Sequence, residues 1–304
     1  MIIHPELLPG KLYAAQPWWK NAVLYQVYPR SFQDTNGDGL GDLEGILRRL
    51  DYLADLGVDI VWISPIYRSP QADNGYDISD YRDIDPLFGD LGAFDALVTR
   101  AHALGMRIVM DLVVNHTSIE HPWFIESASS MNSERRDWYY WRDPRPGFEP
   151  GTPGAEPTNW ESFFGGPAWE YDPSTGQYYL HLFAREQPDL NWENPHVRDA
   201  VYDMMNWWLD RGVDGFRVDA IDVISKLPGL PDGGPPRPPF GVGHECFADG
   251  PRLHEFLQEM HERTFAHHPG SFAVGEASNA SPETALLFCD PERREFNMLI
   301  QFEH

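Results

Sequence analysis

Two continuous apolar runs place the strongest limit on how this chain can fold. The segments VDIVWISPI (58–66) and MRIVMDLVVNH (106–116) are rich in Val, Ile and Met, which is typical of strands that are buried on both faces of a parallel sheet. Apolar residues recur with helical spacing over 43–56 and 91–104, and a glycine follows each of these two segments. This alternation of strands and helices predicts a parallel sheet with right-handed crossovers.

The alternation is interrupted once. Residues 117–190 are rich in Trp, Tyr, Pro and Gly and show no clear helical period, and they are too many for a simple connection between a strand and a helix. We therefore expect an α/β fold, an incomplete (β/α)8 TIM barrel of about six βα units with a subdomain inserted after strand 3. The expected divisions are barrel residues 1–116, inserted subdomain 117–190 and barrel residues 191–304. Further strands are expected at 22–32, 213–221, 271–277 and 295–304, and further helices at 195–211, 251–267 and 282–288.

Composition narrows the class of protein. The chain has 304 residues and a net charge of −24, which argues against a nucleic-acid or anionic-membrane partner. Its two cysteines, Cys246 and Cys289, are too few for a disulfide framework, so we expect a reducing, cytoplasmic location. The first residues lack a basic segment followed by an apolar one, and no apolar run reaches 18 residues, so neither a secretory signal nor a membrane span is expected.

Polar and titratable residues follow several of the expected strands. Asp111 and His116 lie at the end of one strand, Arg217 and Asp219 in another, and Glu276 in a third. In a (β/α)8 barrel the carboxyl ends of the strands carry the catalytic residues. The alternative is that any buried strand can end in a polar residue, and three strands that do so with carboxylates favour the functional interpretation.

The two carboxylates Asp219 and Glu276 are suited to cleaving a glycosidic bond, one as nucleophile and the other as acid and then base. Arg217 lies two residues before Asp219 and therefore points to the same side of the strand. Its guanidinium is expected to lower the pKa of Asp219, whereas the apolar residues before Glu276 are expected to raise the pKa of that carboxyl. An ordinary buried salt bridge between Arg217 and Asp219 is the alternative.

The stretch DTNGDGLGD (34–42) begins like an EF-hand calcium loop. The twelfth position, where an EF-hand needs a glutamate, is Gly45, and a strand is expected before the loop in place of a helix. An EF-hand is therefore excluded. A site for a hard, oxygen-ligated cation and a plain polar loop both remain open.

Four motifs resemble those of the alpha-amylase family, glycoside hydrolase family 13, and they occur in the family's order. Other stretches, such as DNGYDISDY and QPDLNWENP, resemble the oligo-1,6-glucosidase and alpha-glucosidase branch of that family. The four motifs are DLVVNH (111–116), QPDLNW (187–192), GFRVDAID (215–222) and VGEAS (274–278).

The resemblance implies roles for individual residues. Asp219 matches the family's nucleophile and Glu276 its general acid/base. In this branch, an alanine directly after the nucleophile, here Ala220, is associated with specificity for α-1,4 linkages. The implied substrate-binding residues are Asp73, Tyr76, Asp111, His116, Phe164, Phe183, Gln187, Arg217 and Ala220. The implied structural Ca²⁺ or Mg²⁺ site comprises Asp34, Asn36, Asp38, the Leu40 carbonyl and Asp42. Of the family's second calcium site only Asn115 can be matched, so that site is not expected.

The implied function is a retaining, exo-acting α-glucosidase that cleaves α-1,4 or α-1,6 bonds of short oligosaccharides. A transglucosylating or sucrose- or trehalose-converting relative and a non-catalytic, carbohydrate-binding amylase-like module are the alternatives. The family's last two barrel strands and its C-terminal β domain have no counterpart here, and neither has the His-Asp pair that carries the third catalytic acid. We therefore expect residues 1–304 alone to be inactive, and a second chain that supplies the missing strands is one explanation.

Overall fold

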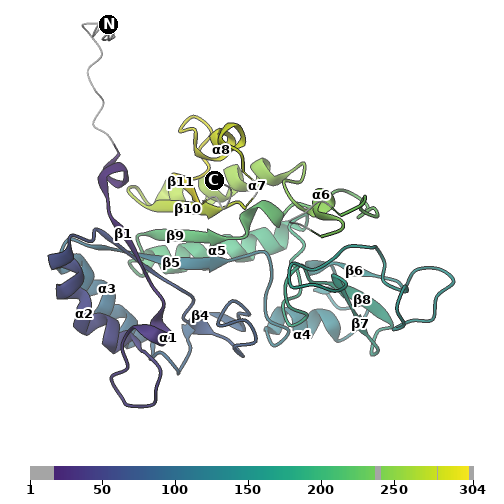
Figure 1. The fold of residues 1–304 in the computed structure, drawn as a ribbon, viewed down its shortest axis with the longest axis horizontal. Coiled ribbons are helices and arrows are strands. Elements are labelled where there is room, and N and C mark those ends of the chain that lie inside the picture. Colours follow the sequence, from purple (N-terminus) through teal and green to yellow (C-terminus); the bar gives the residue numbers. More distant parts are fainter. Residues whose placement is uncertain (1–16, 237–240, 279, 301–304) are drawn as a thin grey trace, which may run out of the picture.

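A computed structural model of the protein describes residues 17–236, 241–278 and 280–300 (Figure 1). Six parallel strands form one curled, open sheet in the order β1-β2-β5-β9-β10-β11. This confirms the predicted incomplete barrel. The strands are β1 (Leu24–Val27), β2 (Ile60–Ile63), β5 (Arg107–Val113), β9 (Gly215–Asp219), β10 (Phe272–Glu276) and β11 (Met298–Ile300). Residues 1–16, where no secretory signal is expected, residues 237–240 and 279, and the end of the last expected strand, 301–304, lie outside the described residues.

The strand register brings the polar strand ends together. Asp111 of β5 is opposite Arg217 of β9, and Arg217 is in turn opposite Val274 of β10. The close approach of β9 to β10 depends on Gly215, because a Cβ there would lie 1.8 Å from the Phe272 carbonyl oxygen. The side chains that follow these three strands therefore gather at one mouth of the sheet.

Five longer helices follow strands of the main sheet, as the periodicity predicts. The first of them begins at Asp42, whose side chain accepts a hydrogen bond from the Gly45 amide, and ends at Gly57 with a φ of 88°. The five are α2 (Leu43–Leu56), α3 (Leu91–Ala103), α5 (Pro195–Asp210), α7 (Leu253–Arg263) and α8 (Pro282–Cys289). Shorter helices are α1 (Pro29–Phe32), α4 (Pro122–Ala128), α6 (His244–Phe247), η1 (Trp18–Asn21), η2 (Arg136–Trp138), η3 (Ile221–Val223) and η4 (Phe265–His267).

Three local predictions were wrong. The strand expected over 22–32 ends at Val27, because Pro29 occupies the first position of α1. No strand is predicted over 67–84, but this region contains the antiparallel pair β3 (Tyr67–Arg68) and β4 (Asp80–Ile84). The inserted region does contain a helix, α4, which begins at Pro122 after the His121 side chain accepts from the Trp123 amide.

Between β5 and α5 the chain forms a separate antiparallel sheet. Its strands are β6 (Trp141–Arg142), β7 (Trp169–Asp172) and β8 (Gln177–Leu180), in the order β6-β8-β7. Figure 1 shows this sheet at the end of the molecule opposite to α2 and α3. It has its own apolar cluster around Trp160 and Trp169, to which Phe247 from the segment after β9 contributes. The boundaries at 116 and 190 stay predictions.

None of the helices in the described part of the chain is both long and apolar enough to cross a membrane. The predicted cytoplasmic location stays a prediction. Cys246 and Cys289 are both free.

Candidate active site

One arginine holds three carboxylates at the mouth of the sheet. The Nη1 atom of Arg217 lies 2.6 Å from Asp111 Oδ1 and 2.5 Å from Asp219 Oδ1. Its Nη2 atom lies 2.5 Å from Glu276 Oε2. The side chain of Arg217 is 7% exposed and that of Asp111 is fully buried. The structure therefore brings the two predicted catalytic carboxylates and two of the predicted substrate-binding residues into one cluster with an excess of negative charge.

Burial decides the protonation of this cluster. It raises the pKa of Asp219 well above the ordinary value, and the Glu276 and Asp111 carboxylates raise it further, while the Arg217 guanidinium lowers it. The expectation that Arg217 leaves Asp219 with a lowered pKa was therefore wrong in its net direction, because desolvation outweighs the ion pair. Burial also raises the pKa of Asp111 to about 6, again against Arg217.

The residue after Asp219 has a strained backbone. Ala220 has a φ of 43° and a ψ of 43°, which is the left-handed region that residues with a side chain rarely occupy. In this conformation its amide donates to Glu276 Oε2 at 3.1 Å. The turn after β9 thus connects the carboxylate at the end of β9 to the one at the end of β10.

A second group of predicted residues lies beside this cluster. The Gln187 amide nitrogen is 3.0 Å from Asp73 Oδ2 and 3.0 Å from His116 Nε2, and the Phe183 ring packs against His116 with 5.1 Å between centroids. Burial lowers the pKa of His116 to about 4, so its imidazole is neutral near pH 7. Burial raises the pKa of Asp73. These contacts join the DNGY and QPDLNW stretches in one place.

Tyr76 and the aromatic residues complete the group. The Tyr76 hydroxyl is 3.4 Å from Asp111 Oδ2, and this connects the second group to the Arg217 cluster. Phe164 lies edge-on to Phe183 at 5.9 Å between centroids and is 60% exposed, so it is not a core residue. All nine predicted substrate-binding positions therefore lie in or beside these two groups, and their roles stay predictions.

Sequence reasoning missed Trp62. Its indole nitrogen donates to Asp111 Oδ2 at 2.9 Å, and the Arg217 guanidinium lies 5.2 Å from its ring centroid. Trp62 belongs to the apolar run 58–66, where an aromatic residue is expected to be part of the hydrophobic core. Its indole N–H, which needs a partner when buried, was the only available signal.

Lys226 was also missed. Its ammonium lies 2.7 Å from Asp189 Oδ2, 3.0 Å from Asn115 Oδ1 and 2.8 Å from the Val223 carbonyl oxygen, and its side chain is 1% exposed. These oxygens, one of them from the VNH motif, already surround a cation. Burial lowers the pKa of Lys226, while Asp189 raises it. Asn115, the one residue that matches the family's second calcium site, therefore contacts a buried ammonium group in this structure.

The loop 34–42 is held by its own side chains. Asp34 accepts from the Gly37 amide at 2.7 Å and from the Gly39 amide at 2.9 Å, which lowers the pKa of its carboxyl. Asp42 caps α2 and also accepts from the Thr35 hydroxyl at 2.7 Å. Asn36 donates to Asp38 at 3.0 Å.

In the part of the chain that the structure describes, no three His, Cys, Asp or Glu side chains converge as a metal ion would need. The oxygen donors of the loop are nevertheless of the kind that suits Ca²⁺ or Mg²⁺. The metal site stays a prediction.

The chain is similar to known proteins over most of its length. The pattern described as "Alpha amylase, catalytic domain" matches residues 26–304. The chain is 56% identical over 288 residues to an oligo-1,6-glucosidase of Parageobacillus thermoglucosidasius, covering 94% of this chain and 50% of that protein. The crystal structure of Bacillus licheniformis trehalose-6-phosphate hydrolase superimposes with a TM-score of 0.88 at 50% identity, over 94% of this chain and 49% of that one. The trehalulose synthase of Pseudomonas mesoacidophila MX-45 gives 0.87 at 47% identity, over 95% and 50%.

The chain belongs to the alpha-amylase family. It spans about half the length of the curated relatives it matches, each covered to roughly 50%.

Proposed function

We propose that these residues form the catalytic centre of a retaining, exo-acting α-glucosidase that acts on short gluco-oligosaccharides by double displacement. Asp219 attacks the anomeric carbon and forms a glucosyl ester, while Glu276 protonates the departing oxygen. Glu276 then takes a proton from the water that hydrolyses the ester. The observation that carries the proposal is the convergence of both carboxylates on Arg217.

The charge in the cluster supports this division of roles. A nucleophile must be ionised, and the Arg217 guanidinium favours the ionised form of Asp219, although it opposes the effect of burial on this pKa only in part. A positively charged substrate ring in the transition state would supply more of that compensation. An oxocarbenium-like transition state is therefore better accommodated between these carboxylates than the neutral ground state is.

The group around His116 supports binding at the non-reducing end of the substrate. Asp73 and the neutral His116 are held by Gln187. The Asp73 carboxylate can accept hydrogen bonds from sugar hydroxyls, and the His116 imidazole can accept a hydrogen bond from a hydroxyl or donate one to it. Tyr76, half-buried beside Asp111, offers a ring for stacking. We propose α-1,4 over α-1,6 linkages because Ala220 follows the nucleophile. One relative is named an oligo-1,6-glucosidase, so substrates with α-1,6 linkages should be assayed beside those with α-1,4 linkages.

Changing the leaving group tests the role of Glu276. In a polypeptide as long as the relatives, Glu276→Gln should lower turnover of maltose by a factor of about 10³ or more. Turnover of an aryl α-glucoside with a good leaving group should fall far less in its first step, because that group departs without a proton. Equal losses on both substrates would refute the assignment of Glu276 as the acid.

We further propose that two more barrel strands complete the sheet beside β1 and β11, either from a longer polypeptide or from a second chain. In the described residues each of these two strands pairs with one neighbour only, and exposed sheet edges favour pairing. Residues 1–304 alone should show no α-glucosidase turnover, and measurable turnover would contradict this.

A second function is favoured by one comparison. The similarity to a trehalulose synthase supports a sucrose-converting or transglucosylating reaction at the same carboxylates. The glucosyl ester would then be attacked by a sugar hydroxyl in place of water. Product analysis after incubation with sucrose and with maltose distinguishes glucose release from the formation of new disaccharides.

We also propose a structural Ca²⁺ or Mg²⁺ ion at the loop 34–42, held by the side chains of Asp34, Asn36, Asp38 and Asp42 and by the Leu40 carbonyl. Its effect would be to fix the loop after β1. Adding Ca²⁺ after treatment with a chelator should slow amide exchange in residues 34–42, and unchanged exchange with both cations would exclude the site.

A further inference from the structure

A groove with a volume of about 410 Å³ lies between β4, α4, η2 and α5, and its lining includes none of the residues of the Arg217 cluster. Its aromatic lining is formed by Tyr81, Trp123 and Trp138. The two indoles meet edge to face with 5.0 Å between centroids, and each is partly exposed. The volume is within the range of about 300–1,000 Å³ that is usual for small-molecule sites.

The indole N–H groups in this groove differ from those of the core. Each buried tryptophan donates its indole N–H to a protein oxygen, at distances of 2.8 to 3.0 Å. Those residues are Trp62, Trp141, Trp160, Trp169, Trp192 and Trp208. For Trp123 and Trp138 no protein acceptor is found among the described residues. Their rings face a groove with donors that a bound molecule could use.

The charged side chains that line the groove are two arginines and two aspartates, Arg82, Arg135, Asp80 and Asp203. Arg82 pairs with Asp203 at 2.5 Å and Arg135 with Glu126 at 2.7 Å. Asp80 adds a carboxylate that accepts from the Arg82 amide at 2.8 Å. Burial lowers the pKa of His121 to about 3, so this ring is neutral. A lining of paired charges and free indole donors suits a neutral ligand that is rich in hydroxyls better than an ion.

We propose that this groove is a second saccharide-binding site, which takes a neutral gluco-oligosaccharide. The apolar face of one sugar ring stacks on an indole, and the hydroxyls at its edge bond to Asp80, Asp203 and the free indole N–H groups. Arg135 covers one face of Trp138, with 4.1 Å from its guanidinium carbon to the ring centroid, so the sugar stacks on the other face or on Trp123.

Tyr81 separates this groove from the candidate active site. Its ring lies 6.1 Å from that of Trp123, and its hydroxyl donates to the carbonyl oxygens of Val113 and His116, at 2.8 Å and 2.9 Å. The two sites therefore share a wall but have no common lining among the residues that contact sugar.

Hydrogen–deuterium exchange of the 304-residue chain with maltotriose tests the proposal, because it reads the two sites separately. Maltotriose should slow amide exchange in residues 79–82 and 121–138. In Trp138→Ala the concentration needed for half of this effect should rise about tenfold, the loss expected when a stacking face and a donor are removed. In Trp138→Phe, which keeps an aromatic face, it should rise only about threefold.

Two further variants, one control and one second test of the groove, complete this experiment. Tyr52→Ala removes an exposed aromatic side chain of α2 outside the groove and should leave the effect unchanged. Asp203→Ala removes a carboxylate whose side chain is 76% exposed and should weaken binding about threefold even if Trp138→Ala fails to fold. Absence of slowed exchange in 79–82 and 121–138, or slowing that neither variant changes, would overturn the proposal. Slowing confined to 215–219 and 272–276 would support the catalytic site alone and likewise overturn it.

Discussion

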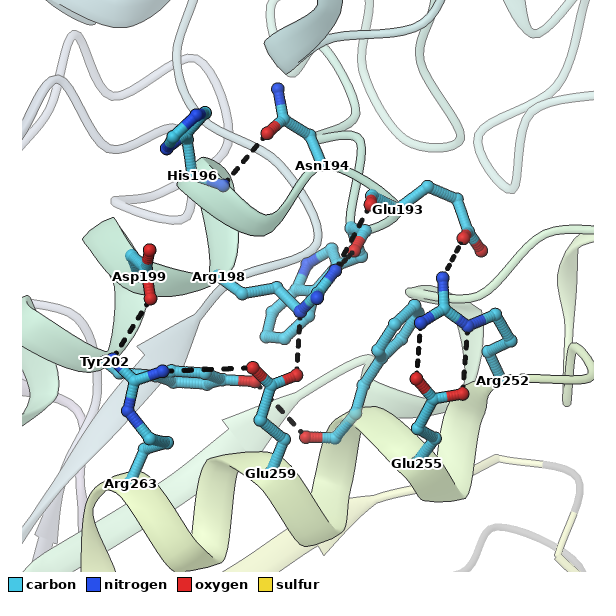
Figure 2. A network of polar contacts seen from close by, with 12 residues as sticks. Glu193, Asn194, His196, Arg198, Asp199, Tyr202, Arg252, Glu255, Glu259 and Arg263 are labelled. Carbon is cyan, nitrogen blue, oxygen red and sulfur yellow. Dashed lines mark hydrogen bonds and ion pairs between the residues drawn. The ribbon is translucent and has the colours of Figure 1, made fainter.

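Two groups of paired charges in this molecule use the same residue types and differ in burial and balance. At the mouth of the sheet one arginine, with a side chain 7% exposed, pairs with three carboxylates. Between α5 and α7 three arginines pair with four carboxylates, and Figure 2 shows Arg252 held between Glu193 and Glu255. The members of this second group, the α5–α7 network, are Arg198, Arg252, Arg263, Glu193, Asp199, Glu255 and Glu259.

The difference in burial and charge balance indicates which of the two groups is suited to a reaction. The carboxylates of the α5–α7 network are 30% to 58% exposed, so water compensates their charge. The pairs made by Arg252 and Arg263, whose side chains are 36% and 49% exposed, each add only about 0–1 kcal/mol to stability. At the mouth of the sheet water cannot do this, and burial raises the pKa of Asp219 and Asp111. Such an unbalanced, buried cluster costs stability, which is typical of a site that holds charge for a reaction.

The largest expected effect contrasts one aspartate from each group. In a polypeptide as long as the relatives, Asp219→Asn should lower α-glucosidase turnover by a factor on the order of 10⁴ or more, because the nucleophile is lost. Asp199→Asn, in the α5–α7 network, should leave turnover unchanged. Similar kcat values for Asp219→Asn and the unmodified protein would contradict the proposed role of Asp219 as nucleophile.

Lys226 represents a third case, a buried pair with balanced charge. Lys226→Ala leaves Asp189 buried without its cation, and it should lower the free energy of unfolding of the chain by about 3–5 kcal/mol. The matched change in the exposed network, Arg263→Ala, should cost about 0–1 kcal/mol. Urea denaturation measures both. Similar losses would mean that burial does not separate the two kinds of pair.

Stability measured over a range of pH tests whether burial also raises the pKa of Asp222. This residue is 2% exposed and accepts from the Ser278 amide at 3.1 Å. Burial and then Asp249 raise its pKa to about 7, so the folded protein keeps the proton to higher pH than the unfolded chain does. Its contribution to stability is present below about pH 4 and is lost as the pH rises through about 7.

Asp222→Asn removes this titration and keeps an acceptor for Ser278. The stability of the variant relative to the parent should therefore rise between pH 4 and pH 7, by about 2–4 kcal/mol. Asp199→Asn should show no such rise, since its carboxylate is 53% exposed. A flat difference for Asp222→Asn would show that the carboxyl is ionised in the folded state throughout.

Much of the fold could be predicted because its signals are local. The apolar runs became β2 and β5, and the helical period from Leu43 ended at Gly57 as predicted. The antiparallel pair β3–β4 and helix α4 were missed, since they are short and depend on contacts with the rest of the molecule.

In the candidate site, too, the positions of residues within motifs could be predicted, and contacts between distant residues could not. Asp219, Arg217 and Glu276 lie within motifs that stand at strand ends, so their convergence followed from the parallel sheet. Lys226 and Asn115 are 111 positions apart in the chain, and no local pattern announces their contact. The net rise in the pKa of Asp219 could not be predicted either, because it depends on burial and on the number of neighbouring carboxylates.

Covalent trapping of the nucleophile tests the central claim most directly. A polypeptide as long as the relatives is incubated with a fluorinated α-glucosyl fluoride, whose glucosyl ester hydrolyses slowly, and its peptides are analysed by mass spectrometry. The account predicts one glucosyl adduct on Asp219, none in Asp219→Asn, and none on any member of the α5–α7 network. An adduct on Glu276, or turnover of the reagent with no adduct on Asp219, would contradict it.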